Sequence, residues 1–129
     1  MTPPDKLSVW RYPGVVITAQ FFPTEMLTNK LGVPPACVWF GTNPAGVDTY
    51  ELEFAIAKGI NAGHVAHEAL HAAIRIVRRD KRIPKMGLHF PTIKSVAGRR
   101  EEALCHTVTT ITNKVLALAA AKGISYVTV

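Results

Sequence analysis

The sequence predicts a single α+β domain in which a small, twisted, mainly antiparallel sheet packs on two long helices. Segments rich in Val, Ile, Trp and Tyr, typical of strands, fill residues 7–57. Two stretches with apolar residues at helical spacing fill the second half of the chain. At 129 residues the chain fits one domain, residues 1–129, built around one core.

The first part of the chain predicts two short strands and a connecting helix. Residues 7–12 and 14–19 are strand-like, and Pro13-Gly14 between them predicts a hairpin or a bent strand. Residues 24–32 carry Thr24 in a capping position, apolar residues at helical spacing and Gly32 at the end. This pattern predicts a helix of about two turns.

A β-hairpin is predicted next, from two strands at 36–41 and 47–57. The residues between them, 42–46, are turn formers. In the second strand every other residue is apolar, which is the period of a half-buried strand. The apolar positions are Tyr50, Leu52, Phe54 and Ile56.

Two helices and a long basic loop follow. Residues from about 63 to 79 have helical periodicity, and Pro84 prevents the helix from continuing. Residues 80–97 lack a steady period and predict a loop. The second helix is expected at about 99–122, with Gly123 as a left-handed cap, although the β-branched run at 107–112 lowers helix propensity. Residues 124–129 can form a terminal strand.

Composition excludes several classes of protein. No apolar run approaches the roughly 20 residues that cross a bilayer, and the N-terminus lacks the apolar segment of a secretory leader. With two cysteines, neither in a CxxC pair, no disulfide framework and no disulfide partner are expected. We expect Cys37 to lie in the core, Cys105 to be a buried structural thiol, and the protein to be cytoplasmic.

The charge is unevenly distributed. The formal net charge is +6, and nine of the fifteen Lys and Arg residues lie between Arg75 and Arg100, where Asp80 is the sole acid. This segment is either a solvated helix end followed by a soluble loop, or a contact surface for nucleic acid or another anionic partner. No P-loop, zinc-finger spacing or RNA-recognition aromatic pattern accompanies it.

The most informative motif is HExxH, which falls inside the first long helix. Residues four apart lie one turn above each other, so His67 and His71 can direct two imidazoles at one metal ion. Glu68 lies about 100° around the helix, where it can reach a metal-bound water without being a ligand. The alternative is that both histidines lie on a solvated face and bind nothing. In an otherwise apolar helix, however, such groups would be costly if unpaired.

A catalytic zinc site needs a third protein ligand and keeps its fourth position for water. Glu102 is favoured because it lies at the start of the second helix, where a carboxylate can face the first helix. His89, in the basic loop, is the next choice, and Glu101 is expected to face solvent. His106, four residues after Glu102, can hydrogen-bond that carboxylate or a developing oxyanion. The remaining candidates are His64 and Cys105.

The pattern His67-Glu68-x-x-His71 with a downstream glutamate resembles the zincin metallopeptidases, specifically the gluzincin type. The residues around the motif, from Val65 to Ala73, and the later Glu102-Ala103-Leu104 also resemble very small zincin-like proteins encoded by bacteriophages. The resemblance implies a minimal zincin-like fold, one Zn²⁺ per chain held by His67, His71 and Glu102, and Glu68 as general base. It also implies a bacterial host cytoplasm, and a strand within residues 47–57 whose edge aligns an extended substrate.

We therefore expect a zinc-dependent hydrolase, a peptidase acting on a peptide or protein substrate. Glu68 would take a proton from the water and pass it to the leaving amine, with His106 assisting. The alternative is a catalytically inactive zincin-like protein that binds a protein or nucleic acid through its basic loop. Hydrolysis of a non-peptide amide would suit the same metal ligands.

Overall fold

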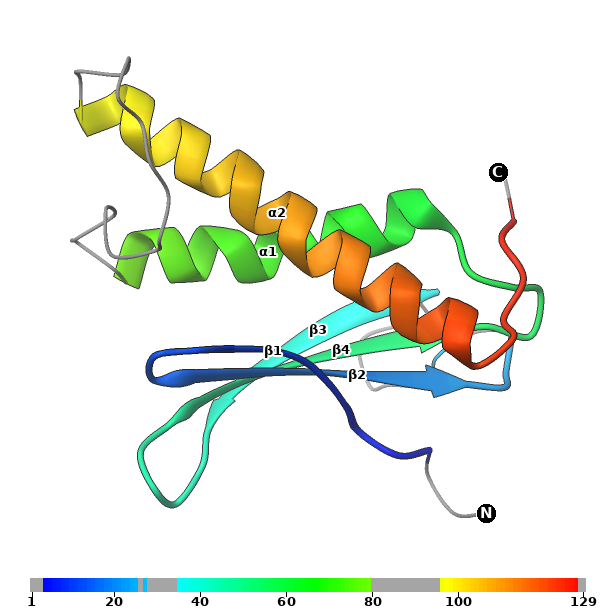
Figure 1. Cartoon of the computed structure of the whole chain (residues 1–129). Coiled ribbons are helices and arrows are strands. Elements are labelled where there is room, and N and C mark those ends of the chain that lie inside the picture. The colour runs from blue at the N-terminus through cyan, green and yellow to red at the C-terminus, as the bar shows by residue number, and fades with distance from the viewer. Residues whose placement is uncertain (1–3, 26, 28–34, 80–95, 128–129) are drawn as a thin grey trace.

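A computed structural model of the chain describes residues 4–25, 27, 35–79 and 96–127. In this part of the chain, a four-stranded sheet carries two helices on one of its faces (Figure 1). The elements are β1 (Leu7–Tyr12), β2 (Val15–Phe22), β3 (Ala36–Thr42), β4 (Asp48–Ala55), α1 (Ala62–Arg79) and α2 (Val96–Ala121). The predicted α+β class is confirmed.

The sheet joins two antiparallel hairpins through a parallel pair of strands. The strand order is β1-β2-β4-β3, and β2 and β4 run parallel from Val15 opposite Asp48 to Phe22 opposite Ala55. Gly14, with φ of 79°, makes the first turn. In the second turn, the side-chain oxygen of Asn43 accepts hydrogen bonds from the backbone N–H groups of residues 45 and 47, both at 3.0 Å.

The position of β4 corrects one prediction. Because β4 is paired with β2 on one side and β3 on the other, it has no free edge. The predicted role of residues 47–57 as a substrate-aligning edge is therefore wrong. Pairing between β2 and β4 is non-local and leaves no signal in the spacing of residues. The free edge beside α1 belongs to β3.

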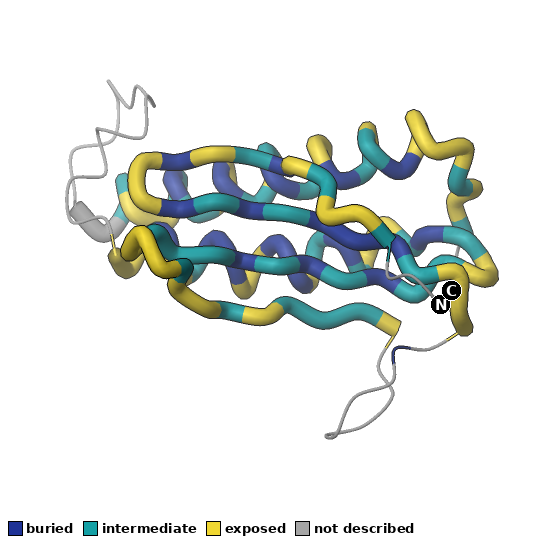
Figure 2. Tube along the Cα trace, turned by 90° about the horizontal axis from the view of Figure 1, so that it is seen from below, coloured by how far each residue is buried: buried dark blue, intermediate teal, exposed yellow. Residues whose placement is uncertain are grey.

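The core lies between the sheet and the helices. Buried residues alternate with less buried ones along β4 and much of β2, and Figure 2 shows this as alternating dark blue and teal bands. The predicted apolar face of β4 is confirmed, since Tyr50, Leu52 and Phe54 are buried. Cys37 was expected in the core, but its place in the alternation puts it on the open face, where it is half-buried.

Helix α1 covers the β3 and β4 half of the sheet, and α2 contacts β1. The side chain of Asn61 caps α1 by accepting a hydrogen bond from the backbone N–H of His64 at 3.0 Å. Val65, Ala69 and Ile76 are fully buried along one side of the helix. This packing fixes the rotation of α1 about its axis, and with it the direction of every polar side chain on the helix.

Helix α2 forms despite its run of β-branched residues. Thr107 and Thr109 donate their hydroxyl hydrogens to the carbonyls four residues earlier, at 2.7 and 2.9 Å, so these hydroxyls are satisfied within the helix. Ile111 is fully buried. The helix begins at residue 96, three residues before the predicted start. Its end is the predicted glycine cap, because Gly123 has φ of 72°.

The remaining predictions fall partly or wholly on residues that the structure does not describe. Most of the predicted helix at 24–32 and the loop residues 80–95 lie outside the described residues. The predicted terminal strand at 124–129 is reduced, in the described part, to a single parallel bridge between Ile60 and Tyr126. No helix in the described ranges is sufficiently long and apolar to cross a membrane.

Candidate metal site

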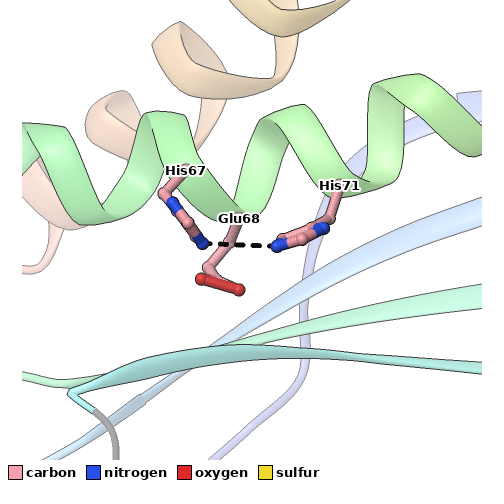
Figure 3. A group of neighbouring side chains, drawn as sticks. All are labelled: His67, Glu68 and His71. Atoms are coloured by element: carbon pink, nitrogen blue, oxygen red, sulfur yellow. Dashed lines mark hydrogen bonds between the residues drawn. The ribbon is translucent and has the colours of Figure 1, made fainter.

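Three polar side chains converge on the side of α1 that faces the start of β3. His67 and His71 are exposed, Glu68 is buried, and their candidate ligand atoms all lie within 4.8 Å of one another. Figure 3 shows the three side chains projecting from the helix on the same side as the strand next to α1. Helical spacing brings the two histidines one turn apart, as the sequence predicted. Among the described residues, no other group of three such side chains is this close.

The spacing of the two imidazoles suits a tetrahedral metal ion. Their Nε2 atoms lie 3.3 Å apart. Zn–N bonds of about 2.0–2.1 Å at a tetrahedral angle put two ligand nitrogens about 3.3–3.4 Å apart, so the two values agree. The same separation also allows one ring nitrogen to donate a hydrogen bond to the other, with the two rings in different tautomers.

Glu68 occupies a different environment from its neighbours. Its side chain is 6% exposed, and it is the one buried carboxylate among the described residues. Burial raises the pKa of Glu68 above its ordinary value, while the nearby His67, His71 and His64 lower it. A carboxylate with a raised pKa is a stronger base than an exposed one.

A hollow of about 280 Å³ opens beside this group. It is lined by Pro35 and Ala36 at the start of β3 and by His64, His67 and Glu68 on α1. The edge of β3 thus borders the space next to the carboxylate. Residue spacing does not predict this wall, since the packing of β3 beside α1 depends on the strand order.

The structure does not bring Glu102 to the two histidines. Its carboxylate instead lies 3.2 Å from the Nε2 atom of His106, one turn further along α2, and both side chains are about half exposed. The two helices lie side by side over the sheet, and the polar group is on the β3 side of α1. The expected contact between His106 and Glu102 is therefore present, but away from the HExxH group.

The other candidate ligands have different positions. Glu101 is exposed, as expected. His89 lies outside the described residues. Cys105 was expected to be buried and is exposed. Residues four apart form the buried side of α2, namely Ala103, Thr107, Ile111, Val115 and Ala119. Cys105 lies midway between Ala103 and Thr107 in the sequence and so points to the opposite side of the helix.

Comparison of the chain with protein-family models, with curated proteins and with solved structures gives no match.

Proposed function

We propose that this protein is a zinc-dependent hydrolase, and that it acts as a peptidase. The observation that supports the proposal best is the pair of Nε2 atoms 3.3 Å apart with the buried Glu68 beside them. His67 and His71 would hold the metal. When bound, zinc would polarise the substrate carbonyl and lower the pKa of a water molecule.

Glu68 has the role of general base. Its carboxylate accepts a proton from the attacking water and then donates it to the leaving amine. His106 does not belong to the group around Glu68, and its Nε2 atom lies 3.2 Å from the carboxylate of Glu102. We assign His106 to positioning the Glu102 carboxylate rather than to proton transfer.

A peptide is the proposed substrate because of the neighbouring strand. β3 is hydrogen-bonded to β4 along one side, and no other strand among the described residues pairs with its outer side. An extended peptide can add to such an edge through backbone hydrogen bonds. Ala36 places one end of this edge at the hollow that contains Glu68. A non-peptide amide would gain nothing from the strand.

Glu68→Gln tests the catalytic role. The variant should retain zinc and lose turnover of a peptide library by at least about 100-fold, the smaller end of what a general base contributes. Glu101→Gln makes the same chemical change at an exposed position and should leave turnover unchanged. If Glu68→Gln cleaves peptides as fast as the unaltered protein, the proposed mechanism is wrong.

The resemblance to gluzincins implies Glu102 as the third zinc ligand, but its carboxylate lies away from His67 and His71, against His106. His64 is the better-placed third ligand, because it lines the same hollow as His67 and Glu68. Zinc affinity should fall by at least about tenfold in His64→Ala and stay close to normal in Glu102→Ala. The reverse result would assign the ligand to Glu102. Loss in both variants would indicate four protein ligands and a structural metal, which favours the inactive binding protein.

A further inference from the structure

A second polar hollow lies further along α1, beyond the histidines. It measures about 430 Å³ and is lined by Arg75, Arg78 and Arg79 from the helix and by Asp48 and Tyr50 from β4. Positions 67, 71, 75 and 79 follow one another at intervals of four. Arg75 and Arg79 therefore continue the helix side that carries His67 and His71.

Arg75 is held by an aromatic ring. Its guanidinium carbon lies 3.8 Å from the centroid of the Phe40 ring, and Phe40 in turn meets Tyr50 edge to face at 5.0 Å. Stacking occupies one face of the guanidinium and leaves the N–H groups around its rim able to donate. Arg75 is nonetheless exposed. This arrangement presents a fixed, planar donor group to the hollow.

Arg79 and Arg78 differ in their partners. Arg79 lies 3.3 Å from the carboxylate of Asp48 and donates to the carbonyl of Pro13 at 3.1 Å, which anchors it to both hairpins. Arg78 is exposed, and no carboxylate of the described residues lies within ion-pairing distance of it. Within the described part of the chain, the hollow thus combines an anchored guanidinium, a stacked one and one with no ion-pair partner.

The charge balance of this hollow is positive. Three guanidiniums face one carboxylate, and 3 − 1 leaves a net charge of +2. The C-terminus of a helix adds about half a negative charge, so the excess remains about +1.5. The negative end of the helix dipole therefore balances only part of the positive charge of these three arginines. An anion with several oxygens would satisfy the remaining N–H donors.

We propose that this hollow binds the phosphodiester backbone of a nucleic acid. Arginine suits phosphate because its planar fork donates two parallel hydrogen bonds to two oxygens. The chain as a whole has a net charge of +6, with nine of its fifteen cations between residues 75 and 100, which favours a polyanion over a single small anion. The site uses neither metal nor His67, and so is independent of the proposed hydrolase activity.

Binding of a labelled single-stranded 20-mer of mixed sequence, followed by fluorescence anisotropy at several salt concentrations, tests the proposal. Arg78→Gln should weaken binding by about 5- to 10-fold at low salt and reduce the slope of log K against log salt by about 0.7, the contribution of one phosphate contact on a single strand. Lys114→Gln removes one charge from an exposed position on α2 and serves as the matched control. It should change the affinity less than twofold.

Three results would overturn the proposal. One is equal weakening by Arg78→Gln and Lys114→Gln, which would mean that net charge alone attracts the strand. Another is binding of a mononucleotide as tightly as the 20-mer, which would make a free phosphate ester the ligand. The third is displacement of the 20-mer by a Glu-rich peptide of equal charge at equal concentration. Arg75→Lys keeps the charge and loses the planar fork, so it should also weaken binding.

Discussion

Replacing Ile76 by alanine tests the rotation of α1 that places the polar group beside β3. Ile76 is 0% exposed. The substitution removes three carbons, worth about 0.8 kcal/mol each or about 2.4 kcal/mol together, and the residual cavity adds about 1 kcal/mol. We therefore expect the free energy of unfolding to fall by about 3.5 kcal/mol. For a domain of this size, that lowers Tm by roughly 14 °C.

Leu70→Ala is the matched control on the same helix. Leu70 is 41% exposed, and its truncation should cost less than about 1 kcal/mol. Urea unfolding followed by circular dichroism measures both variants, with the slope of the transition checked for each. If the two substitutions cost the same, or if Ile76→Ala costs under about 1 kcal/mol, α1 does not pack on the sheet by the side described above.

Two further predictions concern a helix cap and the two thiols. Asn61→Ala removes the cap on the His64 N–H and should cost about 1 kcal/mol in urea unfolding; no measurable loss would exclude a capping role. Burial, and then the bond to Glu53, raise the pKa of Cys37 from 9.0 to about 12. At pH 8 it should react with iodoacetamide two to three orders of magnitude more slowly than the exposed Cys105. The raised pKa also means that the Cys37 thiol contributes stability below pH 9 that is lost as pH rises from 9 toward 12. Equal labelling of the two cysteines by mass spectrometry would contradict this environment.

Local patterns in the sequence were enough to predict the helices and strands that carry the site. The alternation at Tyr50, Leu52 and Phe54 predicted a half-buried strand, and these three side chains are buried. Helical spacing placed His67 and His71 one turn apart, and their nitrogens are adjacent. These features depend on residues within a few positions of one another, where backbone geometry alone fixes the relation.

Features that depend on contacts between distant parts of the chain were not predicted. The parallel pairing of β2 with β4 makes β3 the edge strand beside α1, and nothing in the spacing of residues encodes that choice. The position of Glu102 likewise depends on how two helices lie over the sheet. Sequence spacing showed that Glu102 and His106 share a helix face, but not that this face is separate from the HExxH group.

Helix α2 shows how tertiary contacts override propensity. Its run of threonine, valine and isoleucine would be a strand if isolated. Within the fold, Ile111 is fully buried and the Thr107 hydroxyl bonds within the helix. Burial of one side of the helix outweighs the small propensity cost, which is at most about 0.7 kcal/mol for each residue.

The zinc content of the purified protein tests the central claim most directly. The protein is prepared without added metal or a histidine tag and compared with His71→Ala by elemental analysis, before and after incubation with zinc. The proposed site predicts about one zinc per chain, lost or much weakened in the variant. Absence of zinc even after incubation, or equal zinc in the two proteins, would contradict the assignment of His67 and His71 as metal ligands.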